Sequence, residues 1–217
     1  ALFTAAIRHP KIVALSIGTR PDCLPDEVLD LCARVNREKP VWLELGLQTI
    51  HEDTAVFIRR GYPLSVFTQA VYALAERNIP VVVHIILGLP GESRETVLRT
   101  IDYLNRLPIQ GVKLQLLHVL SDSDLADLYR AGEYTPLEKE EYLTLVGDCI
   151  AHLRADIVLH RLTGDGDKNT LLAPLWSLRK RDVLNHLHRY LRENHIRQGM
   201  SCKIDLSVIY NKPKDVL

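Results

Sequence analysis

The sequence predicts an α/β fold built on a mostly parallel sheet. Short apolar runs alternate with helical segments along most of the 217 residues, which is typical of βα units. Hydrophobic residues make up 47% and charged residues 25%, an ordinary globular mixture. The sheet is either an open doubly wound sheet or an arc of a β/α barrel, because about five strands are too few for a closed eight-stranded barrel.

Five apolar runs predict the strands. Each run is short and rich in aliphatic residues, and the first is nearly continuous, the pattern of a parallel strand buried on both faces. The runs are residues 11–17, 41–47, 80–87, 111–118 and 156–162.

Helical periodicity fills the intervals between these runs. Pro25 stands in a first turn with Asp26 and Glu27 beside it, where a helix N-terminus favours both residue types. Another helix opens at Ser93. The predicted helical segments are 25–35, 51–60, 64–77, the one from Ser93, 122–132, 136–154 and 178–194. Residues 199–217 break the pattern and are predicted to form a peripheral tail.

Charge and cysteine usage narrow the class of protein. Lys+Arg and Asp+Glu both number 27, so no global positive field indicates nucleic-acid binding. No apolar run approaches the ~20 residues of a membrane-spanning helix. The cysteines form no Cys-x-x-Cys pair, and we expect reduced, packed thiols in a cytoplasmic protein. They are Cys23, Cys32, Cys149 and Cys202.

Polar residues follow every predicted strand. In parallel α/β proteins the functional surface lies beyond the carboxyl ends of the strands, so these residues predict a ligand site along one edge of the sheet. In chain order they are Thr19, Arg20, Gln48, Thr49, Glu92, Ser93, His118, Arg161 and Asp165, with Glu44 and Gln115 inside strands.

Each of these residues also has a structural interpretation. Burying the Glu44 carboxylate unpaired costs several kcal/mol, so it needs a ligand or a partner, for which Arg20 is a candidate. His84 fits an ordinary sheet histidine as well as a ligand contact. Gly88 permits close approach of the backbone to a ligand, but it also fits a tight turn.

The basic run Arg179, Lys180 and Arg181, with Trp176 nearby, fits either a phosphate-backbone contact or a solvated helix face. The pair Arg161 and Asp165 is either a surface ion pair or part of a substrate site.

Taken together, several blocks resemble the radical S-adenosylmethionine (SAM) superfamily, in particular its YhcC/YtqA-like subgroup, a relative of the Elongator catalytic subunit. The blocks are residues 15–25 (LSIGTRPDCLP), 43–49 (LELGLQT), 84–92 (HIILGLPGE), 161–165 (RLTGD) and 172–177 (LAPLWS) with Lys180.

The resemblance implies a partial (β/α)6 TIM-type barrel whose strand ends hold SAM and a [4Fe-4S] cluster. It places Ile86, Gly88 and the stretch from Leu116 to His118 near the adenine, and Glu44 and Gln48 near the methionine and ribose. The full set of implied cofactor-binding residues is Ser16, Thr19, Arg20, Glu44, Gln48, His84, Ile86, Gly88, Leu116 and His118. Weaker substrate candidates are Arg161, Asp165 and Lys180.

The resemblance also implies a division of the chain and an activity. Residues 1–120 would be the C-terminal part of the barrel, 121–198 a family-specific extension of helices plus one strand, and 199–217 the tail. The full-length enzyme would cleave SAM reductively with an electron donor, and the resulting 5′-deoxyadenosyl radical would take hydrogen from a substrate. Relatives suggest modification of a tRNA wobble uridine.

One block of the superfamily is missing. None of the four cysteines matches its three-cysteine cluster loop, and the sequence begins without methionine inside a helical pattern. We therefore expect no metal ligand in this chain, a fragment inactive on its own, and an exposed sheet edge that invites self-association. Two alternatives stay open: a β/α-barrel lyase or hydrolase using Glu44, His84 or His118, and a non-catalytic ligand-binding module.

Overall fold

A computed structural model describes residues 2–204 and shows a five-stranded sheet in which every neighbouring pair of strands is parallel. The strand order is β1-β2-β3-β4-β6, so the chain moves across the sheet in one direction. The strands are β1 (Leu15–Thr19), β2 (Val41–Gln48), β3 (Val81–Leu87), β4 (Gly111–Leu116) and β6 (Val158–Arg161). The predicted α/β fold with a mostly parallel sheet is confirmed.

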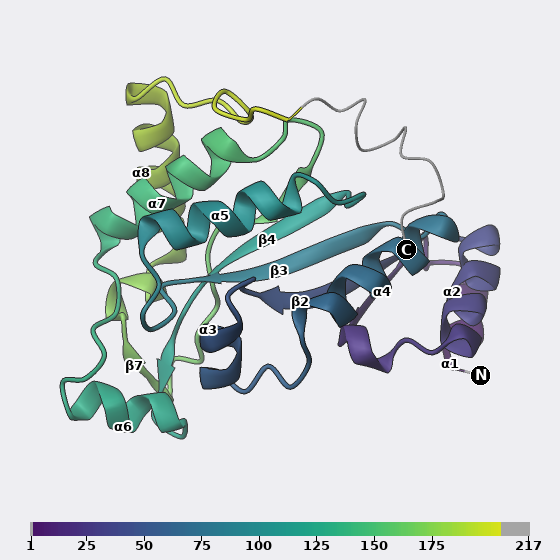
Figure 1. The fold of residues 1–217 in the computed structure, drawn as a ribbon, viewed down its shortest axis with the longest axis horizontal. Helices are drawn as coiled ribbons and strands as arrows, with labels where there is room; N and C mark the ends of the chain where they lie inside the picture. The colour runs from purple at the N-terminus through teal and green to yellow at the C-terminus, as the bar shows by residue number, and fades with distance from the viewer. Residues whose placement is uncertain (1, 205–217) are drawn as a thin grey trace.

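Helices connect the strands as the sequence predicts (Figure 1). Ser93 caps α5, because its hydroxyl accepts the backbone N–H of Thr96. The helices are α1 (Leu2–Arg8), α2 (Asp26–Glu38), α3 (Glu52–Phe57), α4 (Leu64–Glu76), α5 (Arg94–Leu104), α6 (Asp124–Arg130), α7 (Lys139–His152) and α8 (Lys180–Glu193), with short 3-10 turns at Pro21–Cys23 and Leu175–Leu178.

The main core lies on one face of the sheet. Alternate residues of the central strands, such as Leu45, Val83 and Leu114, pack against apolar residues of α2, α4, α5 and α7. The other face carries the half-buried positions of β2, β3 and β4. This half-buried face is the one that carries the polar side chains of the sheet.

The first strand is shifted from its predicted position. Val13, inside the predicted run, is 79% exposed, and the strand begins only at Leu15. β1 is an edge strand with one neighbour, and its burial alternates along the strand, so the apolar run overstated its burial. Self-association through such an edge stays a prediction.

A second, small unit was not predicted. Strand β5 (Val119–Leu120) pairs antiparallel with β7 (Leu171–Ala173), and both are too short to give a periodic signal. Together with α6 they enclose a separate apolar cluster around Val119 and Ala126. Figure 1 shows α3, α6 and β7 gathered at one end of the main sheet.

The boundary predicted near residue 120 stays a prediction, and the main sheet runs across it because β6 pairs with β4. Of the predicted tail, residues 199–204 are described, and the amides of Gly199 and Ser201 bond to carbonyls of α7; residues 205–217 lie outside the described part. None of the helices between residues 2 and 204 has the length and hydropathy needed to cross a bilayer.

Candidate functional site

A chain of hydrogen bonds crosses the half-buried face of the sheet from β1 to β4. Ser16 donates to Glu44 Oε1 at 2.6 Å. Glu44 Oε2 accepts from His84 Nε2 at 2.8 Å and from the ammonium of Lys113. Gln115 Nε2 lies 2.8 Å from His84 Nδ1. Four adjacent strands, β1 to β4, thus contribute polar side chains to a network centred on the Glu44 carboxylate and the His84 imidazole.

The bonding pattern and the pKa values fix the charge of these two groups. Burial alone would raise the pKa of Glu44, but hydrogen bonds from Lys113, Ser16 and His84 and the Lys113 charge outweigh burial and lower the pKa to about 2. Burial lowers the pKa of His84, and the Lys113 charge adds to this against the opposing effect of Glu44. At neutral pH the carboxylate is ionised, and the neutral imidazole donates from Nε2 to it and accepts at Nδ1 from Gln115.

The partner of Glu44 differs from the expected one. Arg20 instead forms a two-bonded pair with Asp22, at 2.9 and 2.7 Å, on the loop after β1. Lys113 was missed because it stands in an apolar strand run. Its spacing of two from Gln115 puts both on the same face of β4, which was the available signal.

A cavity of about 490 Å³ lies over the half-buried face of the sheet, toward the carboxyl ends of β1, β2 and β3. Six of the predicted cofactor-binding residues line it: Thr19, Arg20, Glu44, Gln48, His84 and Ile86. Ser16 contributes through its bond to Glu44. The structure therefore brings most of the predicted strand-end residues together around one space.

Gly46 and Gln48 together shape the cavity wall at the end of β2. A Cβ added to Gly46 would lie 2.7 Å from Gln48 Nε2, and Gln48 itself has a left-handed φ of 66°. The hydroxyl of Tyr62 donates to the Gly46 carbonyl. Gly46 thus leaves room for the Gln48 amide to fold over the strand.

The loop on the far side of this cavity is held by Arg60, which sequence reasoning missed. Its side chain is 2% exposed, and it donates to the carbonyls of Thr49 at 2.6 Å and Tyr62 at 2.9 Å. It also pairs with Glu52 at 3.1 Å. This buried guanidinium ties the loop between α3 and α4 to the end of β2.

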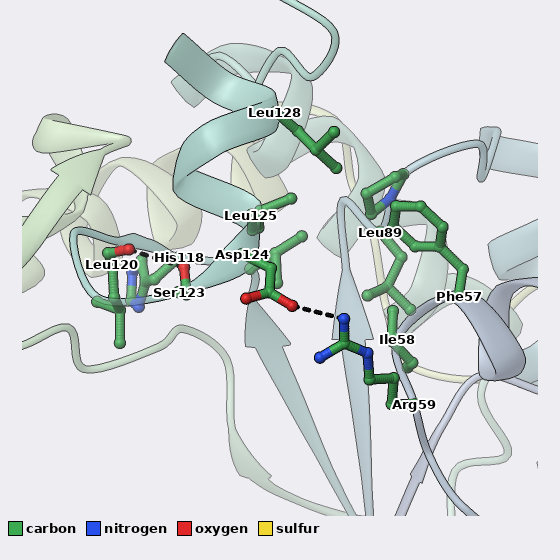
Figure 2. Close-up of a pocket in the computed structure, with 12 residues that line it drawn as sticks. Phe57, Ile58, Arg59, Leu89, His118, Leu120, Ser123, Asp124, Leu125 and Leu128 are labelled. Carbon is green, nitrogen blue, oxygen red and sulfur yellow. Dashed lines mark hydrogen bonds and ion pairs between the residues drawn. The ribbon is translucent and has the colours of Figure 1, made fainter. Parts of the chain in front are cut away.

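Besides Ser16, three predicted residues lie outside this cavity. His118 lines a second cavity of about 610 Å³ between α3 and α6 (Figure 2). Its Nε2 lies 3.0 Å from Ser177 Oγ. Gly88, with a φ of 88°, lines a third cavity of about 440 Å³, and Leu116 is buried. Their contact with a cofactor stays a prediction.

The weaker substrate candidates form one exposed cluster. Asp165 pairs with Lys180 at 2.6 Å and with Arg161 at 3.5 Å. Both cations are thus partly neutralised by one carboxylate, which leaves Arg179 and Arg181 as the exposed basic residues at the start of α8.

The cysteines do not form an iron–sulfur site. They lie on separate elements, and Cys32 and Cys149 are buried while Cys23 is exposed, so they do not provide the grouped thiols that a cluster needs. In the described part of the chain, no three or more His, Cys, Asp or Glu side chains are grouped so that they could hold a metal ion.

A parallel sheet with a polar cavity toward the carboxyl ends of its strands is typical of α/β proteins that bind ligands at that edge. The sequence profile of the Radical SAM superfamily matches residues 1–104, and that of the Radical_SAM C-terminal domain matches residues 109–193. The chain therefore belongs to the radical SAM superfamily, which confirms the resemblance.

Curated relatives agree. YtqA of Bacillus subtilis is 36% identical over 197 residues, which are 91% of this chain and 61% of YtqA. YhcC of Escherichia coli K12 is 36% identical over 197 residues, 90% of this chain and 64% of YhcC. The chain thus spans less than two thirds of these relatives. A tRNA uridine(34) acetyltransferase of Methanocaldococcus jannaschii is 26% identical over 139 residues, 63% of this chain and 25% of that protein.

A solved structure supports the fold. Elp3 of Methanocaldococcus infernus with an N-terminal deletion superposes with a TM-score of 0.74 at 20% identity, over 86% of this chain and 43% of that one. At 20% identity this similarity is evidence for the fold alone. The five parallel strands are thus part of a TIM-type barrel of the radical SAM kind.

Proposed function

We propose that this chain is the SAM-binding part of a radical SAM enzyme and that the cofactor occupies the cavity toward the carboxyl ends of β1, β2 and β3. One observation carries the proposal. The wall of the cavity holds the Glu44 carboxylate, which is ionised at neutral pH and whose position is fixed by Ser16, His84 and Lys113. Because the Lys113 ammonium already balances its charge, Glu44 offers a ligand a fixed hydrogen-bond acceptor, which suits the amino and hydroxyl donors of SAM.

The other groups of the cavity match the remaining parts of SAM. The hydroxyl of Thr19 and the amide of Gln48 offer neutral hydrogen bonds, and Arg20 and Arg59, each already paired with an aspartate, border the same cavity. When bound, SAM supplies the reductive cleavage chemistry characteristic of its superfamily. The protein binds and orients it, and neutral His84 keeps Glu44 from turning away.

The residues of the chain do not fit the iron–sulfur cluster of this superfamily. We propose that the cluster thiolates lie outside these 217 residues and that this chain alone does not cleave SAM. Anaerobic incubation with iron, sulfide and reductant is expected to give no iron–sulfur absorbance. Stoichiometric cluster binding by the chain would contradict this. The electron donor stays a prediction.

The SAM proposal is tested by calorimetric titration of SAM into the 217-residue chain and two variants. A Cβ on Gly18 meets no atom within 4 Å, so Gly18→Leu adds volume to the cavity with little strain on the fold. Val13→Leu adds apolar volume at an exposed position just before the same strand. We expect weak binding to the wild type and to Val13→Leu, and at least tenfold weaker binding to Gly18→Leu. Equal affinities would place SAM elsewhere.

We further propose an RNA substrate of the tRNA wobble-uridine kind. The support is the similarity to a protein named for tRNA uridine(34), together with the exposed Arg179 and Arg181 at the start of α8. Filter binding of bulk tRNA to the wild type and to the double variant R179Q/R181Q tests it. Loss of two phosphate contacts should weaken binding and reduce the salt slope by about 2. An unchanged slope would argue against this surface.

The lyase or hydrolase alternative finds less support. A carboxylate with a pKa of about 2 is a poor general base at neutral pH, and both ring nitrogens of His84 already have partners. His118 lies in the second cavity rather than beside this pair.

A further inference from the structure

The second cavity, of about 610 Å³, lies between α3 and α6 (Figure 2). Helix α3 falls in the part of the chain that matches the Radical SAM superfamily, and α6 falls in the part that matches the C-terminal domain. Ligand pockets occur preferentially where two such units meet, and this volume is in their usual range. The cavity is thus placed and sized to hold a small molecule or one group of a larger one.

This cavity adjoins the proposed SAM cavity. Four residues line both of them: Ile58, Arg59, Leu89 and Leu117. A group bound in the second cavity therefore lies one side chain away from the first, which is the position that a substrate of the bound cofactor must take.

The lining of the second cavity is mostly apolar. Figure 2 shows Phe57 and Leu89 on one side, with Leu125 and Leu128 of α6 facing them. Phe57 is 53% exposed, although burying an aromatic ring is favourable by several kcal/mol. An exposed aromatic face beside aliphatic walls suits a flat ring that stacks on it.

The polar groups of the cavity carry no net charge. Arg59 Nη2 pairs with Asp124 Oδ2 at 2.6 Å, which joins the end of α3 to the start of α6. Burial lowers the pKa of His118, which favours the neutral imidazole. Because each charge is already matched, a charged occupant would gain little, and an uncharged occupant fits best.

The Arg59–Asp124 ion pair lines the cavity and is weak enough to break when a ligand enters. Its side chains are 81% and 77% exposed, and a pair of this kind contributes ~0–1 kcal/mol, so thermal motion opens it readily. Arg59 is held in a left-handed conformation with a φ of 54°, which non-glycine residues seldom adopt. That backbone conformation sets the direction in which the Arg59 side chain leaves the turn after α3.

We propose that the cavity between α3 and α6 is the substrate site and that it takes a flat, uncharged ring, admitted past the Arg59–Asp124 pair. The role of this ring as substrate rests on the proposed SAM site. The ring can come from two sources, a nucleobase of an RNA or a free aromatic molecule, and both share the same recognition chemistry.

Methyl NMR of the 217-residue chain tests the site, with indole and uridine as uncharged probes and indole-3-acetate as the charged counterpart of indole. We expect saturable shifts of the Leu89, Leu125 and Leu128 methyl groups with at least one uncharged probe. Tighter binding of uridine would indicate the nucleobase source, and tighter binding of indole the free aromatic source. Indole-3-acetate should bind wild type at least threefold more weakly than indole, and Asp124→Asn, which frees Arg59, should remove that difference.

Three variants test whether the shifts come from ligand binding in this cavity and not from a change in folding. Leu125→Trp fills the cavity and should abolish the shifts, whereas Leu175→Trp, at a position 60% exposed and not lining the cavity, should leave them unchanged. Phe57→Ser removes an exposed ring, so it should fold normally and bind about tenfold more weakly through lost stacking.

The outcomes separate this inference from the proposed function. Absence of saturable shifts with both uncharged probes, shifts that persist in Leu125→Trp, or stronger wild-type binding of indole-3-acetate than of indole would overturn the inference. If SAM fails to bind its cavity while the probes bind theirs, the ring site stands and the proposed SAM function falls. If SAM binds its cavity and the probes do not bind theirs, the proposed SAM function stands and the ring site falls.

Discussion

Glu44 and His84 lie on neighbouring parallel strands, and the Nε2–H of His84 donates to Glu44 Oε2 at 2.8 Å. The bond connects a carboxylate whose pKa is lowered to about 2 with an imidazole whose pKa is lowered mainly by burial. The pair therefore carries one negative charge at neutral pH, which the Lys113 ammonium balances. The sheet thus presents to the cavity a carboxylate held in place by bonds from three other strands.

Replacing Lys113 should change both members of the pair. Lys113→Met removes a positive charge that lowers the pKa of His84, so that pKa should rise. The loss of a bond to a half-buried carboxylate should also lower the free energy of unfolding by about 2 kcal/mol. Titration of the His84 ring signals by NMR and urea denaturation measure the two effects. The exposed Lys168→Met is the control, and an unshifted His84 pKa in Lys113→Met would contradict the network.

Acid should remove the contribution of Glu44 to stability. Its pKa in the folded state, about 2, lies below its ordinary value of 4.5, so the stabilisation is complete above about pH 4.5 and is lost as the pH falls toward 2. The difference in free energy of unfolding between wild type and Glu44→Gln should therefore be largest near neutral pH and shrink by about pH 3. Urea denaturation at a series of pH values measures it. A difference that stays constant with pH would refute the low pKa.

Two glycines on the same face provide a matched test of the cavity wall. A Cβ on Gly46 meets Gln48 Nε2 at 2.7 Å, whereas one on Gly18 meets nothing within 4 Å. Gly46→Ala should displace the Gln48 side-chain amide, and because that amide is the far end of a flexible side chain the change should cost less than about 1 kcal/mol, whereas Gly18→Ala should leave the amide in place. NMR signals of the Gln48 side-chain amide compare the two variants. An unshifted Gln48 amide in Gly46→Ala would show that Gly46 is not needed for the position of Gln48.

Adjacent arginines should behave in opposite ways. Arg60 is buried and bonds to the carbonyls of Thr49 and Tyr62, so Arg60→Met should lower the free energy of unfolding by about 3 kcal/mol. Arg59 is 81% exposed, so Arg59→Met should change it by less than about 1 kcal/mol. Urea denaturation of the two variants gives the comparison, and similar losses would disprove a structural role specific to Arg60.

Most of the fold could be predicted from sequence because the central strands are nearly continuous apolar runs and the helices are amphipathic. β1 was misplaced because residues 12–14 are apolar although Ile12 and Val13 are exposed. The β5–β7 pair was missed because two- and three-residue strands carry no period. The strand-end rule grouped most of the site correctly, since parallel strands bring their carboxyl ends to one edge.

The pairing within the site could not be predicted. Sequence indicated that Glu44 needs a partner, but the choice between Arg20 and Lys113 depends on strand order, which places β4 two strands from β2 with His84 between them. Arg60 and Tyr62 were missed for a similar reason. They reach the cavity from a loop whose return path over β2 is set by tertiary packing rather than by a local pattern.

The location of SAM is the central claim, and the ring signals of His84 test it most directly. SAM is titrated into the 15N-labelled 217-residue chain while the imidazole signals of His84 and of the exposed His160 are followed. The account predicts a saturable shift at His84, none at His160, and loss of the shift in Gly18→Leu. An unshifted His84 at SAM concentrations that saturate any other signal would contradict it.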